Sequence, residues 1–239
     1  MSKFWKETVP EGYYDISTQE GTKNGRSIQT NWHHITFTRV KVNIKKNDRI
    51  LDFAFGSGNF FASIDNLNEE SIGLDISDKQ IKYANKKYSD IAKFNTLENF
   101  DFESNKENFD VITCLGLIEF IEIREINELI SKFYDLLKPG GTLIITTPNF
   151  QFTMKILEKI LNKIGKINYE EQYKNRFVYS DLVTLFANTQ FSHFEINKII
   201  TGLVFLSIIS NKISSKLNEL FENFFKNKLG FLFLVTLKK

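Results

Sequence analysis

The chain has 239 residues, of which 42% are apolar and 25% charged, as in an ordinary globular protein. Its single cysteine, Cys114, excludes a disulfide framework and a zinc site built on paired cysteines. The formal net charge of +2 provides no strong field to recruit nucleic acid or an anionic membrane. The N-terminal segment lacks the apolar core of a signal peptide, and the longest apolar stretch, 203–209, is too short to cross a bilayer. We therefore expect a soluble, cytoplasmic protein.

Strands and helices alternate over residues 49–148. Short apolar runs predict buried strands at 49–55, 71–75, 109–115 and 142–147, with a weaker strand near 93–95. Helices are expected at 28–42, 59–64 and 121–137, and after Ser77, where Ser77 and Gln80 have the spacing of a capping box. Pro139 and the two glycines after it end the helix over 121–137. This alternation predicts an α/β fold with a parallel sheet and right-handed crossovers.

The pattern changes after residue 149. We expect an amphipathic helix over 152–166, a helix over 181–188 capped by Ser180, strands at 194–200 and 231–238, and an amphipathic helix over 212–226. The lysines of 152–166 favour a solvated face, with a lid over an acidic substrate or a membrane-surface helix as alternatives. For the helix over 212–226, core packing or contact between two copies is favoured over lipid. The predicted organisation is a helical cap over 1–48 and one domain over 49–239, with insertions at 150–178 and 202–229.

A glycine turn and two acids indicate a nucleotide cofactor. Asp52 lies on the first strand of the domain, and Gly56 and Gly58 follow it, so that the backbone can approach a ligand. Asp75 ends the next strand, about 20 residues beyond the first of these glycines, at the spacing that suits a ribose diol. A dinucleotide needs a third glycine where Phe61 stands, which disfavours a nicotinamide enzyme. S-adenosylmethionine fits better, because Asp52 can receive its ammonium while the turn faces its carboxylate.

These motifs, with those over 109–113 and 136–145, resemble the class I S-adenosylmethionine-dependent methyltransferases over residues 47–149. The resemblance implies a Rossmann-like, seven-stranded, mostly parallel sheet with helices on both faces and an antiparallel last strand. It also implies S-adenosyl-L-methionine as the cofactor. The expected cofactor-binding residues are Asp52, Ala54, Gly56, Gly58, Asp75, Ile76, Asn95, Thr96, Leu115 and Arg39.

The sequence departs from the family pattern in three features. Ala54 stands where glycine is usual, and no acid or amide clearly follows the third strand, so that Asn95 and Thr96 are the nearest candidates. The chain is distantly similar to ubiquinone-biosynthesis O-methyltransferases, but Gly116 and Phe120 replace two of the three metal ligands of that group. The sequence therefore predicts no metal and does not favour a quinone acceptor.

Methyl transfer requires a positioned acceptor, and a hydroxyl acceptor is helped by a general base. His34 and His33 are the base candidates, since the segment before the first strand packs over the cofactor in this family, and surface histidines are the alternative. Glu119 either faces the substrate or starts a helix, where the dipole stabilises a carboxylate. Arg39 either reaches the cofactor carboxylate, as a similar arginine does in quinone O-methyltransferases, or lies on the surface.

The sequence thus predicts a methyltransferase that acts on a small molecule. A nucleic acid substrate is disfavoured, because the motif that methyltransferases of exocyclic base amines have after the fourth strand is absent. We favour a hydroxyl oxygen as the acceptor, with a sugar or nucleotide-sugar of a glycan pathway as the first guess. A lipid-like aromatic, an amine, or a binding module without turnover are the alternatives. Whether the protein is a monomer or a homodimer stays open.

Overall fold

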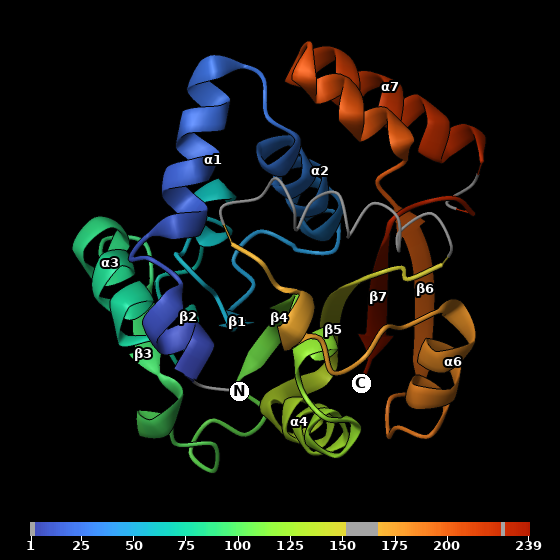
Figure 1. The fold of residues 1–239 in the computed structure, drawn as a ribbon. Coiled ribbons are helices and arrows are strands. Elements are labelled where there is room, and N and C mark those ends of the chain that lie inside the picture. The colour runs from blue at the N-terminus through green and yellow to red at the C-terminus, as the bar shows by residue number, and fades with distance from the viewer. Residues whose placement is uncertain (1–2, 152–166, 226–227) are drawn as a thin grey trace.

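The computed structural model describes residues 3–151, 167–225 and 228–239 (Figure 1). Seven strands form one sheet in the order β3-β2-β1-β4-β5-β7-β6. Their bounds are β1 Ile50–Phe53, β2 Ile72–Asp75, β3 Lys93–Thr96, β4 Phe109–Leu115, β5 Leu137–Pro148, β6 His193–Ile199 and β7 Leu232–Lys238. The strands β1 to β5 pair in parallel, and β7 runs antiparallel to both of its neighbours, β5 and β6. The predicted Rossmann-like α/β fold is therefore confirmed.

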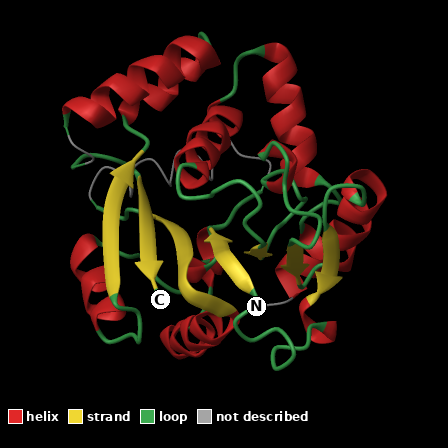
Figure 2. Ribbon diagram, turned by 180° about the vertical axis from the view of Figure 1, so that it is seen from behind, coloured by secondary structure: helices red, strands yellow, loops and turns green. Residues whose placement is uncertain are grey.

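Helices cover both faces of this sheet (Figure 2). The described α-helices are α1 Tyr13–Asn24, α2 Ile28–Lys41, α3 Asp78–Tyr88, α4 Ile123–Leu136, α6 Tyr179–Ala187 and α7 Asn211–Phe224. One core cluster packs α4 and α6 against the sheet, through residues such as Phe133 and Phe186. The second cluster, with Val40 and Ala84 at its centre, packs α2 and α3 against the opposite face. The buried strands and these two clusters hold the carboxyl ends of β1, β2, β4 and β5 rigidly together.

Several local predictions need correction. The segment after α4 joins the sheet directly, because β5 begins at Leu137 and includes the predicted turn with Pro139. The helix expected over 59–64 is a 3₁₀ turn over Phe61–Ser63. The α6 helix begins at Tyr179, not after Ser180, and the Asp181 carboxylate accepts the Val178 N–H at 2.9 Å. The helix predicted over 152–166 lies outside the described residues.

The predicted capping box at the start of α3 does not form. The hydroxyl of Ser77 is buried without a hydrogen-bond partner. The amide of Gln80 instead binds the N-terminal segment, where its Oε1 accepts the Gly12 N–H at 3.1 Å and its Nε2 donates to the Pro10 carbonyl at 2.7 Å. The side chain that would complete the cap therefore connects α3 to the segment that precedes α1.

Candidate active site

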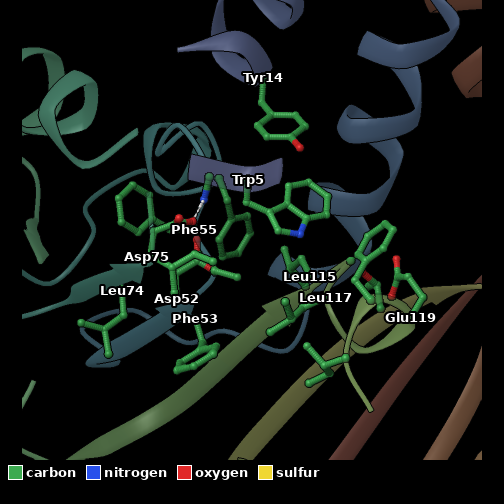
Figure 3. A pocket seen from close by; sticks show the side chains of 18 of the residues that line it. Trp5, Tyr14, Asp52, Phe53, Phe55, Leu74, Asp75, Leu115, Leu117 and Glu119 are labelled. Carbon is green, nitrogen blue, oxygen red and sulfur yellow. Dashed lines mark hydrogen bonds between the residues drawn. The ribbon is translucent and has the colours of Figure 1, made fainter. Parts of the chain in front are cut away.

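A cavity of about 620 Å³ opens at the carboxyl ends of β1, β2, β4 and β5 (Figure 3). This is where ligands bind in open parallel sheets, and the volume lies within the range of small-molecule pockets. Its lining combines the ends of these strands with residues of α1, α2 and α4 and of the segments around residues 5 and 169–173. Within the described residues, no helix is long and apolar enough to span a membrane, and no three acidic, histidine or cysteine side chains gather in a group able to hold a metal.

The two acids predicted at the strand ends enter the same cavity (Figure 3). Asp52 is 2% exposed, and Thr113 donates its hydroxyl to Asp52 Oδ1 at 2.7 Å. Burial raises the pKa of Asp52 to about 7 and that of Asp75 to about 6. Two backbone N–H groups hold the carboxylate of Asp75 in place, Gly56 to Oδ2 at 3.0 Å and Ser77 to Oδ1 at 2.8 Å. Both carboxyl groups are thus fixed in orientation and poorly solvated, as a site for a cationic or hydroxyl-bearing ligand requires.

The turn between the two acids has an unusual backbone. Ala54 and Gly56 both have φ at +61°, in the left-handed region. A glycine adopts this conformation freely, whereas Ala54 pays about 1 kcal/mol for its methyl group. A Cβ at Gly56 would lie 3.2 Å from the ring of Tyr14, which shows that Tyr14 covers the turn. The Gly56 N–H already binds Asp75, so it is not free to face a ligand carboxylate as the sequence suggested.

Glu119 is the third buried acid of the cavity. It belongs to the short 3₁₀ turn Ile118–Phe120 after β4, so it does not start α4, which is capped by the Glu122 segment. Its side chain lines the cavity, is 3% exposed, and has no hydrogen-bond partner for Oε2. Burial raises the pKa of Glu119 to about 7. The side chain of Thr147 interacts with this carboxyl group and partly offsets the rise in its pKa, and a ligand donor that enters the cavity can also bind Oε2.

Aromatic rings from distant parts of the chain form the wall opposite the strand ends. Trp5 stacks on Tyr169 with ring centroids 5.7 Å apart, and Phe120 stacks on Tyr173 at 5.0 Å. Trp5 also meets the edge of Phe120 at 4.9 Å, which joins the two pairs. The hydroxyls of Tyr14 and Tyr169 lie 3.3 Å apart. We refer to Trp5, Tyr14, Phe120, Tyr169 and Tyr173 as the aromatic wall.

The structure brings most of the predicted site residues together. The cavity lining contains Asp52, Ala54, Gly56, Asp75, Ile76, Leu115, His33 and Glu119. His33 lies beside Asn59, with 3.5 Å between Nδ1 and Nδ2, and desolvation lowers its pKa to about 4. At that value the imidazole is neutral at physiological pH and is a weak base.

Five predicted residues lie outside the lining. Arg39 forms a 2.7 Å ion pair with the buried Glu222 of α7, so it does not face the cavity. His34 is exposed on α2. Asn95 and Thr96 do not line the cavity, whereas the next residue, Leu97, does. Gly58 also lies outside the lining and packs against Tyr88. The sequence reasoning missed Trp5, Tyr169 and Tyr173, because scattered aromatic residues have no spacing that identifies them as one wall.

Comparisons with known proteins agree with this geometry. A family model described as "Methyltransferase domain" matches residues 51–143, the part of the chain that holds both acids and Glu119. A phosphoethanolamine N-methyltransferase of Plasmodium falciparum is 27% identical over 207 residues, which cover 83% of this chain and 70% of the relative. The domain match and this relative support the class I S-adenosylmethionine-dependent methyltransferases as the family of this chain.

Solved structures of S-adenosylmethionine-dependent methyltransferases share the fold of this methyltransferase. One from Archaeoglobus fulgidus has a TM-score of 0.58 and 21% identity, and covers 85% of this chain and 91% of its own. Another, from Thermotoga maritima, has a TM-score of 0.60 and 17% identity, with 86% and 88% covered. The cofactor of the methyltransferase is S-adenosylmethionine. Phe61 is fully buried in the core away from the lining, and Phe55 packs on Phe94 at 4.9 Å beside an open cavity.

Proposed function

We propose that the methyltransferase methylates the nitrogen of a small amine. The observation that carries this proposal is Glu119, a buried carboxylate with an unpartnered oxygen in a cavity walled by aromatic rings. An alkylammonium satisfies both features, because it donates to the carboxylate and is attracted to the faces of tryptophan and tyrosine rings. The relative named phosphoethanolamine N-methyltransferase gives independent support for an amine acceptor.

The cofactor-binding roles follow from the position of each residue. S-adenosylmethionine supplies an activated methyl group on its sulfonium. We propose that Asp52 pairs with the cofactor ammonium and that Asp75, held by the Gly56 and Ser77 N–H groups, accepts the ribose hydroxyls. Ile76 and Leu97 lie beyond the end of β2 and after β3, and we assign them to the apolar contact with the adenine.

Glu119 has two roles in this proposal. It orients the amine on entry, and with a pKa of about 7 it can take the proton that the ammonium must lose before its lone pair attacks. The nitrogen then forms a bond to the methyl carbon while the carbon–sulfur bond breaks, and the electron pair of the carbon–sulfur bond goes to sulfur. The aromatic wall holds the product cation and keeps water out, which leaves positioning and desolvation as the main sources of acceleration.

The structure supports an amine more than the hydroxyl acceptor that the sequence favoured. The histidines were the candidates for the base that would help a hydroxyl acceptor, but His34 is exposed outside the cavity. His33 is inside it, and its pKa of about 4 makes it too weak a base to take a hydroxyl proton at neutral pH.

The proposal can be tested with labelled S-adenosylmethionine and a panel of paired acceptors. We expect label on ethanolamine, phosphoethanolamine or a comparable small amine, and none on the matched alcohols. The Glu119→Gln variant should lose about a hundredfold or more in kcat/KM on the amine while its affinity for the cofactor changes little. Glu122→Gln is the matched control, since Glu122 lies three residues away at the exposed start of α4.

Two results would overturn this assignment. Transfer to a hydroxyl with full activity in Glu119→Gln would point to an oxygen acceptor. Cofactor binding without transfer to any member of the panel would favour the binding module without turnover over the amine enzyme.

A further inference from the structure

Helix α7 has its polar side toward the protein and its apolar side toward solvent. The buried residues of the helix are Ser214, Asn218 and Glu222, which recur at four-residue intervals and so share one face. A globular helix ordinarily buries its apolar stripe. The reversed orientation of α7 therefore needs both an explanation for the buried polar side and an occupant for the exposed apolar side.

Hydrogen bonds explain the buried side. Asn31 of α2 donates to Ser207 at 2.8 Å and to Ser214 at 2.9 Å. Glu222 accepts the Ile200 N–H at 2.6 Å and pairs with Arg39 of α2 at 2.7 Å. These contacts fix the rotation of α7 about its axis, so its apolar side cannot turn inward.

The exposed side presents large apolar side chains. We define the outer face of α7 as the exposed residues Ile213, Leu220, Phe221 and Phe224 of the helix together with Ile208 and Ile209, which precede it. Phe224 is 79% exposed and Ile208 is 66% exposed, values that are rare for such residues on a globular protein unless they serve a binding surface. Within α7, Ile213, Leu220 and Phe224 recur at helical spacing and form one stripe on the side away from Asn218, and Phe221 lies at the edge of this stripe, between it and the buried side.

Lysines border this stripe. Lys212 and Lys216 are exposed on α7, and Lys228 is exposed beyond its end. None of the three forms an ion pair with another described residue, and Glu219 is the exposed acid of the helix. Long lysine side chains beside an apolar stripe can extend toward an anionic surface while the stripe lies within it. The outer face and its border thus have the composition of a helix that lies in a membrane interface.

A second copy of the chain fits this face less well. A 14-residue helix is about 21 Å long and about 10 Å wide, so the stripe offers on the order of 200 Å². A stable interface needs about 800 Å² per partner. Pairing two copies through α7 would also bring their lysines together, whereas an anionic lipid surface neutralises them.

The face is at the active-site end of the molecule. The 3₁₀ helix η6, Gly202–Ile208, and α7 connect the end of β6 to the start of β7. Leu232 at the start of β7 pairs with Pro148 of β5. Both Leu232 and Pro148 line the cavity. Figure 1 shows α7 beyond this end of the sheet, beside α2.

We propose that the outer face of α7 docks the protein on an anionic lipid bilayer. The apolar stripe enters the interface between headgroups and acyl chains, and Lys212, Lys216 and Lys228 contact the anionic headgroups. This inference is independent of the acceptor, because it rests on residues that do not line the cavity.

Co-sedimentation of the full chain with vesicles tests the docking surface. The probes are vesicles of phosphatidylcholine alone and vesicles with about one third phosphatidylglycerol. We expect binding to the anionic vesicles that weakens as salt is raised, and weaker binding to the neutral ones. The Leu220→Ser/Phe224→Ser variant should reduce the partition coefficient by about tenfold or more. Val42→Ser is the control, because Val42 is 74% exposed on a different segment.

Each other outcome is decisive. Both variants are exposed changes and should unfold at the temperature of the wild type, so a loss of binding reports on the surface and not on the fold. Equal partition of the double variant and the wild type, or no binding to anionic vesicles, would overturn the proposal. A dimer in light scattering that the double variant converts to a monomer, without vesicle binding, would assign the face to contact between copies.

Discussion

The two sides of the cavity are built in different ways. The proposed cofactor side consists of Asp52, the 54–58 turn and Asp75, which lie close together in sequence. The Gly56 and Ser77 N–H groups hold the Asp75 carboxylate. The acceptor side combines Trp5 and Tyr14 with Tyr169 and Tyr173, about 150 residues later in the chain, through ring contacts. The first side is determined by local backbone geometry and the second by tertiary packing. We therefore expect substitutions on the cofactor side to change affinity directly, and those on the acceptor side to act through the placement of the N-terminal helices.

Removing the charge of Asp75 should produce the largest effect. In Asp75→Asn the side chain keeps its size, but one carboxylate oxygen is replaced by an NH₂ group. That group cannot accept a hydrogen bond, so either the Gly56 N–H or the Ser77 N–H loses its acceptor. We expect S-adenosylmethionine affinity to fall about a hundredfold, the equivalent of one to two charge-assisted hydrogen bonds. Calorimetric titration measures this loss. Asp78→Asn, an exposed change three residues away, is the control, and a loss below about threefold would remove Asp75 from the cofactor site.

On the acceptor side, Asp15 connects α1 to α3. Its buried carboxylate accepts hydrogen bonds from Tyr83 at 2.7 Å and Tyr88 at 2.8 Å, and it pairs with Lys87. Asp15→Ala should lower the free energy of unfolding by on the order of 2 kcal/mol, because two phenol donors and an ammonium lose their acceptor. Thermal unfolding measures the change, with the exposed Glu20→Gln of the same helix as the control. An unchanged Tm would show that the N-terminal helices are held by other contacts.

This contrast explains what the sequence could predict. The positions of Asp52, Gly56 and Asp75 were predictable because a buried parallel strand can only present its end at one edge of the sheet. The position of Glu119 after the fourth strand was predicted. Its burial was not predicted, since a carboxylate near a helix start is most often exposed. The number of strands and the antiparallel last strand came from the family resemblance and not from the residues alone, and the strand order was not predicted.

The errors have a common physical origin. Arg39 was assigned to the cofactor, but its guanidinium pairs with Glu222, which lies 183 positions later in the chain. Gln80 was assigned to a helix cap, but its amide forms hydrogen bonds with the N-terminal segment. In each case a long-range polar partner outcompeted a local or inferred one, and no pattern within a sequence window identifies such a partner.

The pH dependence of cofactor binding distinguishes the acids of the cofactor side. Asp52 must be ionised to pair with an ammonium, and its pKa of about 7 means that its charged fraction rises about tenfold between pH 6 and pH 8. We expect the affinity for S-adenosylmethionine to rise by a similar factor. In Asp52→Asn the affinity should be lower at every pH and the rise between pH 6 and pH 8 should be largely lost, whereas the exposed Asp65→Asn should keep the wild-type profile.

The stability of the protein without cofactor has the opposite dependence. The raised pKa of Asp52 contributes stability that is complete below the unfolded value near 4 and is lost as the pH rises through 7. Asp52→Asn should therefore flatten the fall in Tm between pH 5 and pH 8 while it weakens cofactor binding. A variant with the wild-type slope in both measurements would show that Asp52 titrates near its ordinary pKa and is not the ammonium partner.

The smallest expected effect concerns the backbone of the turn. Ala54 has φ at +61°, where an alanine is strained and a glycine is not, so Ala54→Gly should increase the free energy of unfolding by about 1 kcal/mol. For a protein of this size that is about 2 to 4 °C in Tm. Asn47, with φ at +69°, is the matched comparison, and Asn47→Gly should give a smaller gain because asparagine tolerates this conformation better than alanine. Equal gains at the two positions would show that the strain at Ala54 is an ordinary property of the left-handed backbone. A larger gain at Ala54 would show that the turn retains a strained alanine beside the proposed cofactor site, where the methyl group of the side chain is unfavourable for the backbone conformation.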